Sequence, residues 1–156
     1  MPTADAAGLS ARAIIDANLY MVLATADGTG WPWGTPVYFA HDGYAEFLWV
    51  SAPEAVHSRN IEARPQIGIV IFDSGAPINT GQGVYMSARA EQVGSDNLSG
   101  GIETFSRRAI GHGGAACTVE DVQADSGLRL YRAAAESYSI LAKDGQPDHR
   151  IPTRPT

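Results

Sequence analysis

The chain has 156 residues and a formal charge of −6, from 17 acidic and 11 basic side chains. This length suits one domain with a substantial core, and the acidic balance argues against a general nucleic-acid or anionic-membrane partner. A single cysteine, Cys117, excludes an intramolecular disulfide framework and a cysteine-rich zinc site, and the lack of a long apolar run or a secretory signal predicts a cytoplasmic protein.

The first half of the chain predicts a short helix followed by antiparallel strands. Residues 1–8 predict a loose arm, and Ile14 and Ile15 mark the inner side of the helix. Turn residues follow at 27–30 (Asp-Gly-Thr-Gly) and 42–43 (Asp-Gly), where glycine permits the positive φ that tight reversals require. The elements expected here are a helix at 10–18 and strands at 20–26, 35–40 and 46–50.

The second half alternates strands with a helical insertion. We expect strands at 67–72 and 83–93, joined by the loop 73–81. An insertion at about 94–127 carries a helix at 97–110, ended by Gly111-His112-Gly113-Gly114, and a helical turn at 118–123. Two closing strands, 128–133 and 137–142, are expected to turn around 134–136, before an extended tail at about 143–156. This order predicts a mainly β fold with short helices, an antiparallel barrel or sandwich in a single domain over 1–156.

The stretch from Trp49 to Gln66 carries the strongest functional signal. An apolar run at 47–50 predicts a buried strand, and Ser51 precedes Glu54 by three residues with Pro53 between them, which is the spacing of a capping box. We therefore expect a helix to start there. A helix N-terminus attracts anions, and His57 and Arg59 lie one to two turns further on, so together these groups suit a phosphate monoester.

A second interpretation of the same stretch is structural. Ser51 then only caps the helix, and His57 and Arg59 are solvated side chains on its exposed face. The sparseness of basic residues favours the phosphate site, because the chain has a single lysine, Lys143.

The order of these elements resembles the pyridoxamine 5′-phosphate oxidase-like FMN-binding split-barrel family. The resemblance rests on the combination of the turn DGTG, the segments TPVYF and FLWVS, the helix EAVHSRNIEARP and the strand IGIVIF. It covers residues 19–93 well and the closing segment LRLYRA more loosely. It implies a split β-barrel, a six- to seven-stranded antiparallel Greek-key barrel. It also implies a homodimer that binds FMN, or in some branches a deazaflavin coenzyme or haem, between its subunits.

The resemblance also implies a set of cofactor-binding residues. Thr35, Pro36 and Val37 are expected along one edge of the isoalloxazine ring. The expected neighbours of the ribityl chain and phosphate are Val50, Ser51, His57, Arg59 and Asn60, and Gln82 is expected to reach the flavin. Only Ser51, His57 and Arg59 have independent support from local chemistry.

The chain departs from true pyridoxamine phosphate oxidases at two cationic positions. Those enzymes carry an arginine-rich strand and a second basic residue before the helix, where this chain has Trp33-Gly34-Thr35-Pro36 and Val56. The C-terminal Asp148-His149-Arg150 resembles their substrate-binding end only faintly. These departures predict a divergent member with another small-molecule substrate.

The function expected from the resemblance is FMN-dependent oxidation or reduction by hydride transfer at flavin N5, where the cofactor supplies most of the chemistry. The alternatives are a deazaflavin-dependent reductase and a non-catalytic flavin- or haem-binding protein. Three aromatic residues, Trp31, Trp33 and Tyr38, are candidates for a wall against a flat ring, or for ordinary packing. His112 is a candidate proton donor or substrate contact, or an exposed loop residue.

Other chemistries find little support in the sequence. The four histidines, His41, His57, His112 and His149, lack the short spacings of a recognisable metal site, and we expect no metal. There is no nucleophile elbow, P-loop or dinucleotide fingerprint. Cys117 has no base near it in sequence and is interpreted as a small buried residue rather than a nucleophile.

Overall fold

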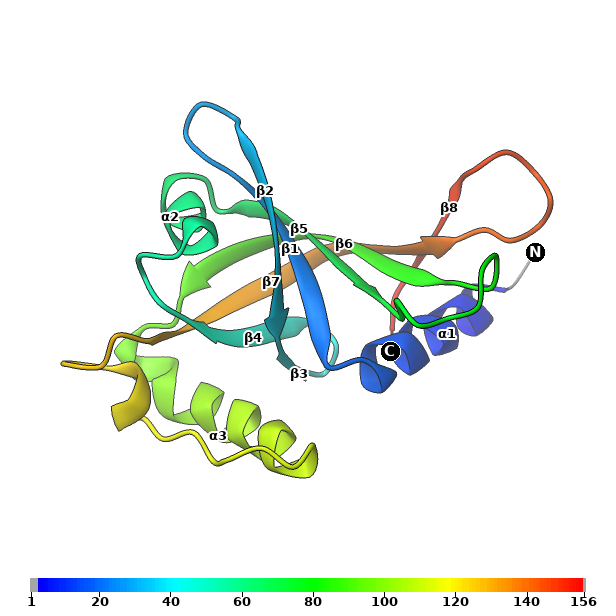
Figure 1. Ribbon diagram of the computed structural model, residues 1–156. Coiled ribbons are helices and arrows are strands. Elements are labelled where there is room, and N and C mark those ends of the chain that lie inside the picture. Colours follow the sequence, from blue (N-terminus) through cyan, green and yellow to red (C-terminus); the bar gives the residue numbers. More distant parts are fainter. Residues whose placement is uncertain (1–2, 156) are drawn as a thin grey trace.

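The computed structural model describes residues 3–155, which form a curled antiparallel sheet with helices packed around it (Figure 1). The helices are α1 (Ala4–Ala17), α2 (Val56–Ala63) and α3 (Ser95–Gly111), with a 3-10 turn η1 (Glu120–Val122). The strands are β1 (Tyr20–Ala26), β2 (Pro32–Tyr38), β3 (Ala40–Asp42), β4 (Glu46–Ser51), β5 (Gln66–Phe72), β6 (Gly83–Gln92), β7 (Arg129–Leu141) and β8 (Arg150–Thr153). The architecture is mainly β, as the sequence predicts.

The hydrogen-bonded order of the strands is β2-β1-β5-β6-β7-β4-β3, and β8 pairs with the last part of β7. Every pairing is antiparallel. Within the described residues β2 and β3 end this order without pairing with each other, so the sheet curls into a barrel that stays open along one side. The predicted split-barrel fold is confirmed.

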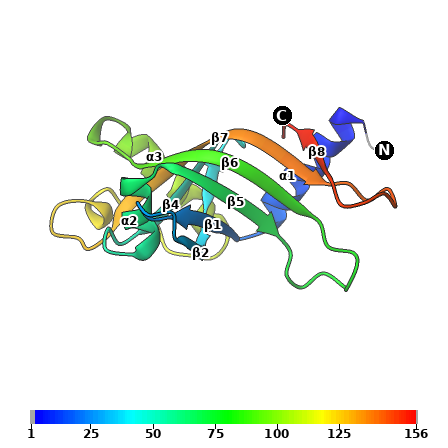
Figure 2. The ribbon, with the colours of Figure 1, turned by 90° about the horizontal axis from the view of Figure 1, so that it is seen from above.

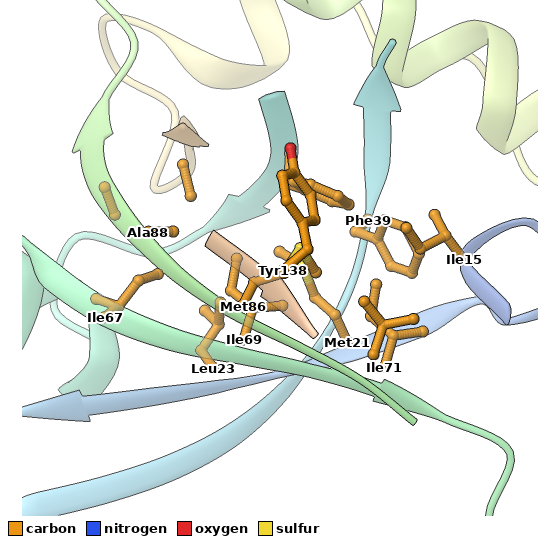
Figure 3. Packing of buried hydrophobic residues seen from close by; sticks show 14 of the residues in the cluster. Ile15, Met21, Leu23, Phe39, Ile67, Ile69, Ile71, Met86, Ala88 and Tyr138 are labelled. Carbon is orange, nitrogen blue, oxygen red and sulfur yellow. The ribbon is translucent and has the colours of Figure 1, made fainter. Parts of the chain in front are cut away.

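The core fills the inside of this curled sheet. Ile67, Ile69 and Ile71 alternate along β5 and all point inward, as the period of two in a strand requires (Figure 3). Ile15 of α1 packs against the same cluster. A second cluster lies under α3, where Ile102 and other α3 residues cover Leu48 and Leu130 of the sheet. Burying each such side chain stabilises the fold by roughly 1.5–3 kcal/mol.

The helices lie at opposite ends of the barrel. Two views agree that α2 and α3 lie at one end, while α1 and β8 lie at the other with both chain termini (Figures 1 and 2). The helix α2 follows directly from β4 and packs against β1, β2 and β6. The end that carries α2 is therefore the one where the candidate phosphate residues gather.

The expected loose arm at 1–8 is wrong from residue 4 onward, and residues 1–2 lie outside the described part of the chain. The helix α1 begins at Ala4, where the Thr3 hydroxyl accepts a hydrogen bond from the Ala6 N–H at 3.2 Å. This is a side-chain N-cap. Ala7 and Ala11 are fully buried against the barrel, so tertiary packing extends the helix beyond the segment where the local pattern is apolar.

The predicted turn at 134–136 is also wrong, because β7 runs as one strand of 13 residues. Its first half pairs with β4 and its last part with β8, while β6 lies along its other side. The β6 register shifts between Ser87 and Ala88, which pair with Ser137 and Ala135, so that Glu136 is the extra residue of a β-bulge. The apolar alternation is interrupted at 134–136, which is why the sequence predicted a turn there. The bulge accommodates this interruption within one continuous strand.

Smaller differences concern the limits of other elements. The expected strand at 35–40 divides into β2 and β3, which are separated at Phe39. The expected helical turn at 118–123 is confirmed as η1, and Asp121 accepts hydrogen bonds from the Thr118 N–H at 2.8 Å and hydroxyl at 3.0 Å. The C-terminal tail contains β8, which the sequence pattern did not predict.

Gly8 offers a test of how α1 docks on the barrel. A Cβ atom at this position would lie 2.6 Å from the Arg154 carbonyl oxygen. Because that contact is with backbone, we expect Gly8→Ala to lower the free energy of unfolding by about 1–3 kcal/mol, measured by urea titration. Gly100→Ala in α3 is the matched control, since a Cβ there meets nothing within 4 Å, and it should leave stability unchanged or slightly raised. Equal effects of the two substitutions would contradict this account of the docking.

Candidate functional site

The strongest candidate site lies where β4 leads into α2. The His57 ring nitrogen Nε2 and the Ser51 hydroxyl Oγ lie 2.8 Å apart, and the two residues are 7% and 9% exposed. Ser51 is the last residue of β4, where it pairs with Arg129 of β7. The end of a sheet strand and the first turn of a helix therefore bring two polar side chains together in a nearly buried place.

The expected capping box is wrong in its details. The helix α2 begins at Val56 with Ala55 as its N-cap, and Ser51 does not cap it. No side-chain hydrogen bond caps the helix, and its first turn holds no acidic residue. The amide N–H groups at the start of α2 thus lack a side-chain acceptor among the described residues, which is the arrangement that favours an anion.

Arg59 lies on the exposed side of α2, unlike Ser51 and His57. The structure brings together two of the three residues predicted to hold a phosphate and leaves the third at the surface of the same helix. Burial lowers the pKa of His57 below its ordinary value of 6.5. The imidazole is therefore neutral at pH 7 in the described chain, and a nearby anion would favour its protonated form.

Asn60 has a structural partner in the barrel. Its side-chain amide donates to the Thr25 hydroxyl at 3.0 Å, and that hydroxyl donates to the Trp33 carbonyl at 3.4 Å. Both Asn60 and Thr25 are buried. This chain of hydrogen bonds ties α2 to β1 and β2, and so fixes the helix start relative to the sheet.

The other residues expected near the cofactor lie on strands around this helix. Thr35, Pro36 and Val37 are consecutive in β2, where Val37 is buried, Thr35 is half-buried and Pro36 is exposed. Val50 is half-buried in β4, next to Ser51. The helix α2 packs against β2 and follows β4 in the chain, so the strands that carry these residues adjoin the helix.

Gln82 lies apart from that group. It immediately precedes β6, whose first residue pairs with Phe72 at the end of β5 remote from α2. Its side-chain oxygen accepts from the Gly83 and Leu141 N–H groups, both at 2.9 Å, and its amide donates to the Leu141 carbonyl at 2.9 Å. In one chain, therefore, Gln82 fastens β6 to β7 and does not reach His57.

The three aromatic candidates separate into two places. Trp31 and Trp33 are 73% and 48% exposed on the β1–β2 hairpin. Arg64, after α2, donates to the Asp27 carbonyl at 3.2 Å and so holds this hairpin to the helix. The sequence analysis gave no role to Arg64, because only the fold brings the two segments together. Tyr38 belongs to a different cluster.

Tyr38 and His112 form a second polar pair, between β2 and the end of α3. The Tyr38 hydroxyl and His112 Nδ1 lie 3.0 Å apart, beside a cavity of about 240 Å³ that both residues line. Burial raises the pKa of Tyr38, against the opposing effect of Arg108. Both residues were candidates from the sequence, Tyr38 for an aromatic wall and His112 for a proton donor, but their pairing was not predictable, since the two are 74 residues apart.

The described part of the chain was also compared with what a metal ion or a reactive thiol requires. Among the described residues, no group of three or more histidine, cysteine or acidic side chains is placed to hold a metal ion. Cys117 is half-buried, and burial raises the pKa of its thiol. None of the helices in residues 3–155 has the length and apolar character needed to cross a membrane.

Buried His57 and half-buried His41 predict a pH-dependent stability. Burial lowers the pKa of His57, and of His41 despite its neighbour Asp16, so the unfolded chain binds these protons more tightly than the folded one. Stability should therefore be complete above pH 6.5 and fall as the pH drops through 6.5, by at most about 1.4 kcal/mol per pH unit for each histidine. Urea titrations of wild type and His57→Gln at pH 7.5 and 5.5 test this, with a smaller loss expected in the variant. Identical losses would exclude His57 as a cause.

The comparisons with known proteins agree with this fold. A family model described as pyridoxamine 5′-phosphate oxidase matches residues 10–149. Among solved structures, a haem-binding protein from Mycobacterium smegmatis aligns with a TM-score of 0.72 and 19% identity, over 97% of this chain and 59% of that one. A FAD-binding protein from Mesorhizobium loti aligns with a TM-score of 0.65 and 18% identity, over 85% of this chain and 91% of that one. An F420 reductase aligns with a TM-score of 0.59 and 19% identity, over 82% of this chain and 94% of that one.

These structural likenesses, all at low identity, show the fold and no more. The chain spans about three fifths of the length of the M. smegmatis protein. A comparison with curated proteins found no match. The family model, in contrast, covers most of the sequence, including β1 to β7 and all of α2 and α3. The chain belongs to the pyridoxamine 5′-phosphate oxidase family of split-barrel proteins.

Proposed function

We propose that the protein binds FMN and is a flavin-dependent oxidoreductase acting on a small molecule other than pyridoxamine phosphate. The observation that carries the proposal is the nearly buried Ser51–His57 pair beside the uncapped start of α2. A hydroxyl, an imidazole and free amide N–H groups at one helix N-terminus suit the phosphate of FMN. Arg59, exposed on the same helix, adds a positive charge at the surface.

The residues of β2 and β4 would hold the rest of the cofactor. Thr35, Pro36 and Val37 offer a strand edge to the isoalloxazine ring, and Val50 lies beside the phosphate residues. A bound flavin supplies hydride transfer at its N5 atom, and the protein supplies position and exclusion of water. The Tyr38–His112 pair then offers a hydroxyl and an imidazole, as hydrogen-bond or proton donors, to a substrate in the adjoining cavity.

A homodimer is part of this proposal. The outer face of the sheet carries an apolar row across four strands, in which Val22 pairs with Pro36 and with Val70, and Val70 pairs with Tyr85. The next row consists of residues with small or no side chains, in which Ala24 pairs with Gly34 and with Gly68. We propose that a second copy covers this apolar face and brings its own Gln82 toward the cofactor site of its partner.

The same fold also suits two alternative cofactors, a deazaflavin coenzyme and haem. A deazaflavin coenzyme also carries anionic groups in its tail, and the Ser51–His57 pair would suit it as well. The likeness to an F420 reductase favours this candidate. The likeness to a haem-binding protein favours a non-catalytic haem-binding protein, for which one histidine is sufficient.

The test is titration of the purified protein with FMN, coenzyme F420 and haemin, followed by absorbance and by calorimetry. We expect FMN to bind with one site per subunit and the bound flavin to be bleached anaerobically by a nicotinamide donor. Preference for F420 would select the deazaflavin alternative. A sharp Soret band with haemin and no binding of either flavin would overturn the proposal.

Arg59→Ala should weaken FMN binding by about 1.5–3 kcal/mol, the scale of a hydrogen bond to a charged group, and leave the fold intact. Arg107→Ala is the control, because Arg107 is an exposed arginine on α3 whose ion pair in the described part of the chain is with Glu103, at 3.1 Å. Calorimetric titration of both variants measures the difference. An FMN affinity of Arg59→Ala equal to that of the control would remove Arg59 from the site.

A further inference from the structure

The hydrogen bonding of the Ser51–His57 pair depends on how many protons the pair carries. His57 Nε2 and Ser51 Oγ lie 2.8 Å apart, and the two residues are 7% and 9% exposed. The other ring nitrogen, His57 Nδ1, makes no hydrogen bond within residues 3–155, and it is not among the fully enclosed polar atoms left without a partner there. Nδ1 is therefore the side of the imidazole that a ligand can reach.

A proton added to His57 doubles the number of donors that the pair offers to a ligand. With a neutral imidazole the pair has one N–H and one O–H, and the bond between the two side chains uses one of them. With an imidazolium, Nε2–H donates to Ser51 Oγ, so that both Nδ1–H and the Ser51 hydroxyl are free to donate. A phosphate group only accepts hydrogen bonds when it is fully ionised, so it favours the protonated pair.

The surroundings keep His57 neutral until an anion arrives. Burial lowers its pKa, and no neighbouring charge contributes to that shift among the described residues. The amide N–H groups at the start of α2 lack a side-chain acceptor and attract an anion to the same place. A phosphate there opposes the effect of burial, because a negative charge within a few ångströms favours the charged form of histidine.

The other charged groups around α2 are exposed or already engaged in the described part of the chain. On the helix and its flanks, Glu54, Arg59, Glu62 and Arg64 are exposed. The strands β1 and β2 pack against α2 and carry tyrosines but no acidic or basic residue, and the Asp27 carboxylate in the turn between them accepts from residues 29 and 31. On β4, β6 and β7, Arg132 pairs with Glu46 and Glu91, Arg89 pairs with Glu136, and Arg129 donates to the carbonyls of residues 124, 126 and 128.

We propose that a phosphate group bound at the start of α2 draws a proton onto His57, so that cofactor binding and proton uptake occur together. This inference rests on the proposed function, since it concerns the same phosphate site. Affinity should rise as the pH falls, by up to about tenfold for each unit between roughly pH 8 and 6.5. It should level off below about pH 6, where the free phosphate itself binds a proton.

Calorimetry on the full chain in two buffers of different ionisation enthalpy, Tris and HEPES at pH 7.5, counts the protons taken up with FMN. We expect about one proton for each FMN bound, and a dissociation constant that increases roughly three- to tenfold from pH 6.5 to 7.5. Riboflavin has the same ring system without the phosphate, and it should bind without proton uptake.

His57→Gln keeps a polar side chain but cannot take the proton. Its FMN affinity should be lower than that of wild type and independent of pH over the same range. His149→Gln is the matched control, because His149 immediately precedes β8 at the other end of the barrel (Figure 1). It should keep the proton uptake of wild type, and circular dichroism establishes that both variants are folded.

An NMR titration of the histidine rings in wild type measures the same event without flavin. Replacing chloride by inorganic phosphate at equal ionic strength should raise the pKa of His57 and leave that of His149 unchanged. Any one of three results would overturn the inference: a His57 pKa that does not respond to phosphate, FMN binding without proton uptake, or an unchanged pH dependence in His57→Gln. If FMN did not bind but phosphate still raised the His57 pKa, the linkage would stand and the flavin assignment would be wrong.

Discussion

Arg108→Met will lower the free energy of unfolding by roughly 2–4 kcal/mol. The Arg108 guanidinium, half-buried at the end of α3, donates to three backbone carbonyls: Phe39, Asn18 at 2.8 Å and Ile15 at 3.5 Å. It also lies over the Phe39 ring, 4.3 Å from the centroid. One side chain thus joins α3 to the end of α1 and to the link between β2 and β3. Methionine keeps much of the packing and leaves the three acceptors without their donor.

Arg107→Met is the matched control for this prediction. Arg107 is the neighbouring residue, mostly exposed, and its ion pair with Glu103 is a surface i,i+4 pair worth a few tenths of a kcal/mol. Chemical denaturation followed by circular dichroism measures both variants. If Arg107→Met and Arg108→Met were equally stable, the carbonyl contacts of Arg108 would not be a significant part of what holds α3 to the barrel.

Arg108 also illustrates what the sequence could not reveal. Its three acceptors are 69 to 93 residues away along the chain, and they are backbone atoms, so no side-chain pattern marks them. The helix that carries Arg108 was predictable, because Ile102, Phe105 and Ala109 recur at helical spacing and are all buried. Local periodicity therefore predicts elements, while long-range contacts of this kind require the fold.

The same distinction explains the error at β7. Ala134, Ala135 and Glu136 interrupt the apolar alternation, which locally favours a turn. In the fold, Ala134 pairs with Glu46 of β4 on one side and Arg89 of β6 on the other, and the bulge at Glu136 absorbs the irregularity. Hydrogen bonding to the two neighbouring strands therefore outweighs the local preference of these residues for a turn.

The candidate site was predictable in part. Ser51 and His57 were selected from the sequence for a helix N-terminus, and they do lie 2.8 Å apart at one. The capping role assigned to Ser51 was wrong because pairing with Arg129 extends β4 as far as Ser51, which delays the helix to Val56. Residue chemistry therefore identified the pair, and the sheet register determined how the two side chains meet.

Val70→Lys on the outer face of β5 is expected to have the largest effect on assembly. In the proposed dimer Val70 lies at the centre of the apolar row formed with Val22 and Tyr85, so each copy would bury an unpaired ammonium group in the interface. We expect the dimer to weaken by about 3 kcal/mol or more, roughly a hundredfold, with little change in the stability of the single chain. Analytical ultracentrifugation over a concentration series measures the dissociation constant.

The matched control is Leu9→Lys, which places the same charge at an apolar side chain 64% exposed on α1, outside the proposed interface. It should leave the dimer unchanged. Because the cofactor site is proposed to need both subunits, Val70→Lys should also lose FMN affinity in parallel with the dimer, and Leu9→Lys should keep it. A monomeric wild type, or a monomeric Val70→Lys that binds FMN as tightly as wild type, would show that one chain holds the cofactor alone. In that case Ser51, His57, the start of α2 and the strand residues of one chain would have to hold the whole cofactor without the partner's Gln82.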